Sequence, residues 1–273
     1  MRIFTPVYMG IRSIIRHRNL LRQLIWRDIQ GRYRGSAGGL GWAVVTPIVL
    51  LSVYTFVFSF VLKTRWAGAA NADAHGTYAV MCFSGLVVYN AFMECLSRSP
   101  GLVTNNINYV KKVVFPLEIL CLVSFGSALF HFFIGLAVLL VFLIAFGFGI
   151  PHTAWAFCLV LPLLGLWSIG IGWVLSSLGV FLRDLGQIVT LIMSILMFAT
   201  PIFYSIDSLP ERYRFLMELN PLSFMIEVLR DVLILGRYPD AYAYLRHLAE
   251  AALLSLFGLW WFQRTREGFA DVL

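Results

Sequence analysis

Long apolar runs separated by short polar stretches dominate this chain of 273 residues. Crossing roughly 30 Å of hydrocarbon takes about 20 apolar residues in a helix. Six runs approach or exceed that length, at residues 40–62, 77–97, 118–147, 154–182, 185–204 and 246–263. Only Arg183 and Asp184 separate the fourth run from the fifth, so a tight charged turn is expected there. The pattern predicts an all-α polytopic membrane protein with six transmembrane helices in a single domain, residues 1–273.

A shorter amphipathic pattern precedes the first run, within residues 1–36. Between residues 20 and 33, four apolar residues recur at helical spacing: Leu21, Leu24, Ile25 and Ile29. Arginines flank this stripe, which predicts an amphipathic helix lying along the inner headgroups. Asp28 falls inside the stripe, so a charged side chain interrupts the apolar face. A generic basic membrane anchor is the alternative interpretation.

The connection between the fifth and sixth runs, residues 205–245, contains another short helical pattern. Its apolar residues recur at helical spacing and comprise Leu222, Met225, Val228, Leu229, Val232 and Leu233. Asn220 and Pro221 are suited to begin this helix and Gly236 to end it. Residues 222–235 are too few to span, so we expect a re-entrant helix or a surface helix, with Arg230 on its polar face.

Composition and charge placement support the membrane interpretation and orient it. The chain is 60% hydrophobic and 13% charged, whereas soluble domains carry about 25% charged residues. Of the 21 Lys and Arg residues, 14 fall on the side that holds both predicted termini and residues 98–117. Because cytoplasmic loops are enriched in Lys and Arg, we predict that this side is cytoplasmic and that residues 205–245 lie outside.

Ionisable residues inside the runs are few: Glu94, His131 and Glu250. Such groups suggest function by default, although Glu94 and Glu250 lie near span ends, where they can reach headgroups. We expect His131 to be neutral and hydrogen-bonded rather than part of a proton relay. The sequence has no metal-ligand spacing, no nucleophile–base pattern and no phosphate-binding loop. No catalytic residue or cofactor is therefore predicted, and any ATPase would be another chain.

Aromatic side chains offer a candidate transport pathway. Tyr54 and Phe58 are four residues apart, and Tyr89 and Phe92 are three apart, so each pair shares a helix face. Sugar rings stack on aromatic faces, so these four residues are candidates to line a glycan pathway. Simple packing within the membrane is the alternative.

The cytoplasmic segment 98–117 reads as a docking loop. Pro100 and Pro116 bracket it, and Lys111 and Lys112 lie next to apolar residues. A short amphipathic helix of this kind suits a groove on a soluble partner. An ordinary basic loop is equally compatible with the composition.

Several segments, in this order, resemble ABC-2-type polysaccharide export permeases, and the resemblance covers nearly the whole chain. They are WRDIQGRYRGS (26–36), VYTFVFS (53–59), NYVKKVVFPLEIL (108–120), FLRDLGQIV (181–189), TPIFY (200–204), NPLSFMIEVLRD (220–231) and FQRTREGFADVL (262–273). The resemblance implies a homodimer of six-span subunits, bound to two copies of a separate subunit that binds ATP and Mg²⁺. Such a transporter would move an undecaprenyl diphosphate-linked glycan across the bacterial inner membrane, between the first and fifth spans of its two subunits.

On this resemblance, residue roles follow by segment. Contacts with the ATPase subunit fall on the N-terminal helix and the 98–117 coupling loop, with candidates Trp26, Asp28, Lys111, Lys112, Phe115, Pro116 and Glu118. The outer gate falls on residues 205–245 and the TPIFY segment, with candidates Pro201, Asn220, Pro221 and Arg230. Arg27, Arg32 and Arg34 are candidates for the lipid diphosphate, because guanidinium forks match phosphate oxygens. Phospholipid headgroups are the alternative ligands.

The substrate class remains open among related glycans. O-antigen is the first candidate, and capsular polysaccharide and teichoic acid are alternatives. A drug or lipid exporter of the same fold, a membrane-embedded glycosyl or acyl transferase and a non-transporting scaffold are rival functions. A transferase would need acid, base or metal residues converging on one cavity, and the spread of Glu94, His131 and Glu250 argues against it. Nucleic acid is not an expected partner.

Overall fold

The computed structural model describes residues 4–61, 66, 76–110 and 115–273, and every regular element within them is helical. Among the described residues, four helical stretches are long and apolar enough to cross a membrane: Gly39–Phe58, Thr77–Gly101, Ile119–Ala145 and His152–Phe181. They correspond to the first four predicted runs. Their elements are η1 (Gly39–Gly41), α3 (Trp42–Tyr54), the π-helix η2 (Thr55–Val61), α4 (Thr77–Arg98), η3 (Ser99–Gly101), α6 (Ile119–Ala145), η5 (His152–Leu159) and α7 (Val160–Phe181).

The last two predicted spans are not among these four stretches. Helix α8 (Leu185–Ala199) has 15 residues, which rise only about 22 Å. It ends where Thr200 becomes extended before Pro201. Helix α11 (Ala241–Thr265) has 25 residues and contains the predicted run 246–263. The charged turn is confirmed, because α7 ends at Phe181 and α8 begins at Leu185.

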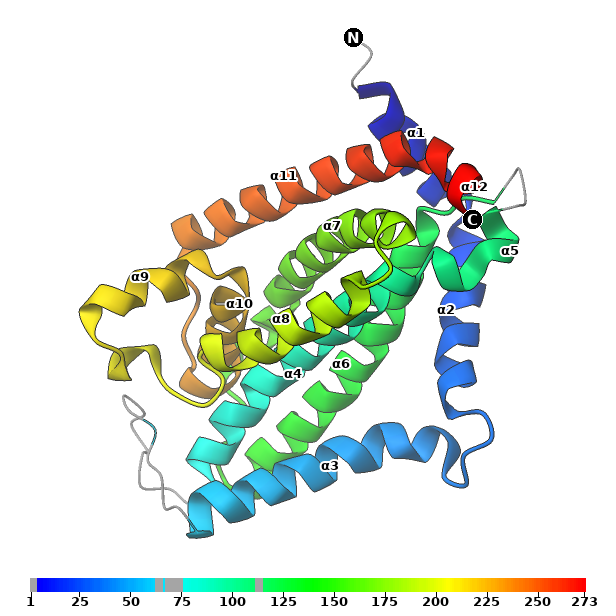
Figure 1. Ribbon diagram of the computed structural model, residues 1–273. Helices are drawn as coiled ribbons and strands as arrows, with labels where there is room; N and C mark the ends of the chain where they lie inside the picture. The colour runs from blue at the N-terminus through cyan, green and yellow to red at the C-terminus, as the bar shows by residue number, and fades with distance from the viewer. Residues whose placement is uncertain (1–3, 62–65, 67–75, 111–114) are drawn as a thin grey trace.

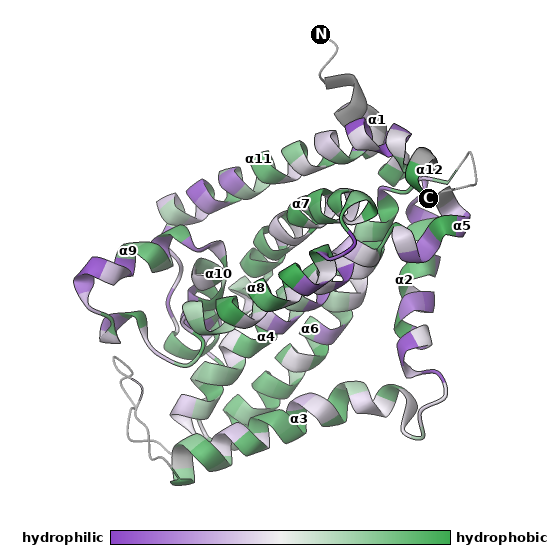
Figure 2. Cartoon of the chain, in the orientation of Figure 1, coloured by the Kyte–Doolittle hydropathy of each residue, from purple (hydrophilic) through white to green (hydrophobic). Residues whose placement is uncertain are grey.

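The remaining elements gather at two opposite ends of the molecule (Figure 1). One end holds α1 (Phe4–Arg16), α2 (Arg18–Tyr33), η4 (Thr104–Asn106), α5 (Ile107–Val110), η8 (Arg266–Gly268) and α12 (Phe269–Val272). The other end holds η6 (Ile206–Ser208), α9 (Glu211–Leu219), α10 (Pro221–Arg230) and the π-helix η7 (Asp231–Leu235). Hydrophilic positions concentrate on α2, α9 and the C-terminal region, while α3 and α6 are mainly hydrophobic (Figure 2). This division follows the two sides that the Lys and Arg distribution predicts.

Helix α10 begins and ends as its sequence predicts. The Asn220 side chain accepts a hydrogen bond from the Leu222 amide at 3.0 Å, and Gly236 ends η7 with a left-handed φ of 69°. Its apolar face is buried: Leu222, Met225, Ile226, Val228, Leu229, Val232 and Leu233 are all at most 1% exposed. The apolar face of α10 therefore packs against the protein, as backbone at membrane depth would require. The choice between a re-entrant and a surface helix stays a prediction.

Glycine allows helices α7 and α11 to approach closely. A Cβ on Gly258 would lie 2.2 Å from the Gly170 carbonyl oxygen, and one on Gly170 would lie 2.8 Å from the Ser255 Cα. Side chains at either position would force the two backbones apart. This contact is typical of small-residue packing between membrane helices, and it ties the last helix to the bundle.

Candidate functional site

Helix α2 docks across the bundle through an apolar patch. Leu24 is buried against Ile119 and Val123 of α6, and Ile25 covers Gly126 of the same helix. A Cβ on Gly126 would lie 2.4 Å from the Ile25 Cδ1. The stripe that the sequence assigned to headgroups therefore faces protein along much of its length.

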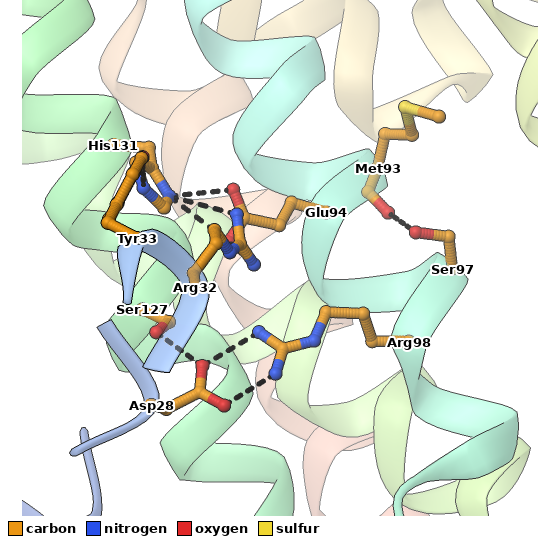
Figure 3. A network of polar contacts seen from close by, with 9 residues as sticks. All are labelled: Asp28, Arg32, Tyr33, Met93, Glu94, Ser97, Arg98, Ser127 and His131. Atoms are coloured by element: carbon orange, nitrogen blue, oxygen red, sulfur yellow. Dashed lines mark hydrogen bonds and ion pairs between the residues drawn. The ribbon is translucent and has the colours of Figure 1, made fainter. Parts of the chain in front are cut away.

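Asp28, the residue that interrupts the apolar stripe, meets polar partners at this interface (Figure 3). Its two carboxylate oxygens accept hydrogen bonds from Arg98 Nη1 and Nη2 at 2.9 and 2.6 Å, a forked geometry. Ser127 Oγ of α6 donates a third, at 2.6 Å. Burial raises the pKa of Asp28, but the bonds from Arg98 and Ser127 and the arginine charges outweigh it, so its pKa is lowered.

One turn further along α2, a second polar group joins the same helices. Arg32 forms an ion pair with Glu94 of α4 at 2.7 Å. His131 of α6 lies between Glu94 and Tyr33, with Nδ1 2.9 Å from Glu94 Oε2 and Nε2 2.7 Å from the Tyr33 hydroxyl. A neutral imidazole satisfies both contacts if Nδ1–H donates to Glu94 and Nε2 accepts from Tyr33. Figure 3 shows both groups together, and we call them the α2 clamp.

Three segments at one end of the molecule are joined beside the clamp. Arg27 Nη2 donates to the Tyr109 hydroxyl at 2.7 Å, and the Tyr109 ring stacks on Phe115 at 4.2 Å. From the C-terminal segment, Arg266 donates to Glu118 Oε2 at 3.0 Å and to the Phe115 carbonyl at 2.9 Å. Helix α2, the 98–117 loop and the chain's end thus form one connected surface.

The predicted ATPase contacts differ widely in exposure. Trp26 is 51% exposed and Phe115 is half-buried, so both remain available to a partner. Pro116 and Glu118 are buried within this chain, which corrects their assignment as direct contacts. Asp28 is likewise engaged internally by Arg98. Lys111 and Lys112 lie outside the described residues.

The three arginines that are candidates to bind the lipid diphosphate lie in different environments. Arg27 and Arg34 are exposed, and Arg34 has no ion pair among the described residues. Arg32 is held by Glu94, so its charge is neutralised within the protein. This contact weakens the case for Arg32 as an anion ligand and assigns it to the clamp.

The aromatic candidates lie in two different environments. Tyr54 and Phe58 are stacked at 6.1 Å, as their spacing predicts, and both lie 6.4 Å from the Phe203 ring. Tyr89 and Phe92, each 3% exposed, are core residues, and the Tyr89 hydroxyl donates to the Met193 carbonyl at 2.7 Å. Neither ring faces an open pathway within this chain, because side chains of neighbouring helices pack against both of them.

Arg230 was expected on a polar face but is 1% exposed and points into the bundle. Its guanidinium donates to Glu227, to the Met81 carbonyl at 2.9 Å and to the Ile202 carbonyl at 3.1 Å. It also lies 4.6 Å from the centre of the Trp66 ring. Of the other outer-gate candidates, Pro201 is buried beside Ile202, while Asn220 and Pro221 begin α10, at the opposite end of that helix from Arg230.

In the described part of the chain, no three His, Cys, Asp or Glu side chains gather as they would to hold a metal ion. The polar groups instead pair with one another across helices. Sequence reasoning singled out Glu94, His131 and Asp28 but not their partners. Tyr33 lies beside His131, and Arg98 and Ser127 bind Asp28, whose place within the apolar stripe was the available signal.

Comparison with known proteins decides the family. The model of the ABC-2 type transporter family matches residues 19–234, most of the chain. This chain belongs to the ABC-2 type transporter family. As a family member it is a multi-pass membrane protein that works with an ABC ATPase.

Similar proteins extend the family assignment over almost the full length. The O-antigen export system permease protein RfbA of Klebsiella pneumoniae is 27% identical over 93% of this chain and 95% of its own. RfbA of Myxococcus xanthus is 26% identical over 96% and 98%. The polysialic acid transport protein KpsM of Escherichia coli is 22% identical over 89% and 92%.

Proposed function

We propose that this chain is the transmembrane subunit of an exporter that moves an undecaprenyl diphosphate-linked polysaccharide, most specifically O-antigen, across the bacterial inner membrane. Two copies would form the pathway and bind two ABC ATPase subunits on the cytoplasmic side. The observation that carries the proposal is the similarity to O-antigen export permeases over 93% or more of the chain. Identity to the polysialic acid permeases is lower, which places capsule export second.

The six-span topology belongs to this proposal. Helices α8 and α11 would complete it, with both termini in the cytoplasm. At 15 residues, α8 needs the following segment of 200–204 to reach the outer surface. Non-helical backbone can lie at membrane depth only when its polar groups are hydrogen-bonded. The Ile202 carbonyl in this segment accepts a hydrogen bond from Arg230, which supports the proposed span.

Transmission of force from the ATPase would use the connected cytoplasmic surface. Exposed Trp26 and half-buried Phe115 are its accessible aromatic groups, and Tyr109, Arg27 and Arg266 join their segments. Because the α2 clamp fixes α2 to α4 and α6, a push on α2 would move these helices as rigid bodies.

The chain itself would hydrolyse nothing. ATP and Mg²⁺ would be held by the partner subunit, and this chain would supply the path, the coupling surface and charge. Exposed Arg27 and Arg34 would attract the diphosphate at the cytoplasmic end.

A deletion strain tests the proposal. Cells lacking this chain should lose surface glycan and accumulate the lipid-linked glycan inside, and the wild-type gene should reverse both effects. The matched control is the same deletion carrying a vector without the gene. Unchanged surface glycan in the deletion strain would refute the proposed export function.

A further inference from the structure

A cavity of about 210 Å³ lies between α3, α4 and α6, next to the α2 clamp. Its walls are largely apolar, with Trp42 at the rim and Phe83 and Phe132 at the floor. Drug-sized ligands occupy pockets of about 300–1,000 Å³, so this space suits a single ring rather than an extended chain.

Polar groups converge on this apolar cavity. Thr46 and Asn90 line it from α3 and α4, and Tyr33, Glu94 and His131 line its clamp side. Asn90 is exposed, and no described residue pairs with its side-chain amide. An amide supplies both donors and acceptors, so Asn90 can bind a hydroxyl in either sense.

The chemistry of the cavity selects a neutral polar ring. A hydrocarbon tail would leave the Asn90 amide without a partner in an apolar setting, which is costly. A phosphate would find no uncompensated cation in the cavity lining, because Arg32 already pairs with Glu94. A pyranose ring meets both conditions, since its C–H face packs on an indole or phenyl ring while its hydroxyls reach amide and carboxylate oxygens.

Position along α4 fits the same ligand. Asn90 lies eight residues before Arg98, the end of α4, or roughly 12 Å along the helix. With the predicted orientation, the cavity lies in the inner half of the membrane. Arg34 directly follows Tyr33 in the chain and has no ion pair among the described residues, so a phosphate attached to the bound ring would have a cation available.

We propose that this cavity binds the sugar ring nearest the diphosphate of the lipid-linked glycan. This rests on the proposed function and deepens it, because it assigns recognition of the glycan's first ring to the cavity between α3, α4 and α6. Asn90 and Thr46 are its hydroxyl-binding residues, and Trp42 is its stacking surface.

Binding of short synthetic probes tests the assignment. The complex of this chain with its ATPase is placed in lipid nanodiscs, and affinity is measured for decyl diphosphate and for decyl diphosphate carrying one glucose, galactose or N-acetylglucosamine. The wild type should bind at least one glycosylated probe more tightly than decyl diphosphate. Asn90→Leu should lower the affinity for that glycosylated probe about tenfold and leave the affinity for decyl diphosphate unchanged.

Two further variants guard against a trivial result. Thr46→Val keeps the side-chain shape, so it should fold normally and weaken only the glycosylated probe, by less than Asn90→Leu. Gln263→Leu makes an amide-to-apolar change on α11, outside the cavity, and should alter neither affinity.

The outcomes separate this inference from the proposed function. Equal losses for both probes would mean that the cavity takes the hydrocarbon tail, and unchanged affinities in Asn90→Leu and Thr46→Val would mean that no sugar is bound there. Either result overturns the inference. Export of the natural glycan by the wild-type complex is measured alongside: if export is intact, only the sugar site falls, and if it is absent, the proposed function falls too.

Discussion

Arg230 illustrates how this protein accommodates a cation among apolar helices. Its side chain is 1% exposed, and burial lowers its pKa, while the Glu227 carboxylate acts in the opposite direction. Two backbone carbonyls, of Met81 and Ile202, and the Trp66 ring complete its surroundings. The charge is therefore compensated by the Glu227 carboxylate, two carbonyl dipoles and the face of an aromatic ring, through which Arg230 joins separate segments at the α10 end of the molecule.

Removing this cation should destabilise the protein. Arg230→Met leaves the Met81 and Ile202 carbonyls without this donor, and we expect a loss of about 2–4 kcal/mol from the free energy of unfolding. Thermal unfolding of the detergent-solubilised complex measures it as a fall in Tm. Arg212→Met is the matched control, because Arg212 is exposed and lies over the Tyr213 ring at 4.6 Å. Equal changes in the two variants would contradict the structural role of Arg230.

Helical periodicity placed Arg230 on the wrong face for a physical reason. The spacing of apolar residues locates the buried stripe, but it does not reveal that carbonyl groups of α4 and the 200–204 segment face a position beside it. Asp28 was the opposite case: its place inside the apolar stripe was visible in the sequence, while its partners Arg98 and Ser127, about 70 and 100 residues away, were not.

At the scale of elements, α2 is the helix whose role depends most on its neighbours. Apolar contacts of Leu24 and Ile25 bring it to α6, and two ion pairs, Asp28–Arg98 and Arg32–Glu94, fix its register along α4. Both pairs are partly exposed, so each one alone contributes modestly. Together with the hydrogen bonds of Ser127 and His131 they define one docked position.

Charge reversal tests this docking. Asp28→Arg places two cations in contact at Arg98, so we expect α2 to detach and proteinase K to cleave it about tenfold faster. The double variant Asp28→Arg with Arg98→Asp restores opposite charges and should recover much of the protection. Arg18→Asp changes charge at an exposed position of α2 and serves as the control. Cleavage of the double variant as fast as that of the single would rule out the ion pair as the docking contact.

Elements with long apolar runs were the most predictable. Runs 77–97 and 118–147 match α4 and α6 within two residues at each end. The fifth run was predicted too long, because apolar residues 202–204 indicate burial at membrane depth but not helical backbone. Pro201 removes a backbone donor, and the chain beyond it packs as a turn against aromatic rings of α3 and η2.

At the scale of the whole molecule, α4 connects the two functional ends. Its C-terminal half carries Glu94 and Arg98 of the α2 clamp, and its N-terminal half supplies Met81 and Ser84 to Arg230. A helix of 22 residues is about 33 Å long, close to the hydrocarbon thickness. Movement of α2 can therefore reach α10 through one rigid helix.

The division of the molecule into two ends was predictable from charge alone, since Lys and Arg are unevenly distributed between the loops. The contacts that join each end were not, because they pair residues from distant segments such as Arg27 with Tyr109 and Arg266 with Glu118. The partner subunit is inferred from the family. The surface proposed to bind it, formed by α2, the 98–117 loop and the C-terminal segment, is seen only in the structure.

The central claim is that this chain moves a lipid-linked glycan only when an ATPase partner drives it. A transport assay tests this directly. This chain and its ATPase partner are reconstituted in proteoliposomes, ATP is supplied, and the amount of radiolabelled lipid-linked glycan that reaches the lumen is measured. Glycan should accumulate with the active ATPase and not with a hydrolysis-deficient one. Accumulation by this chain without ATP, or none with the active ATPase, would contradict the account.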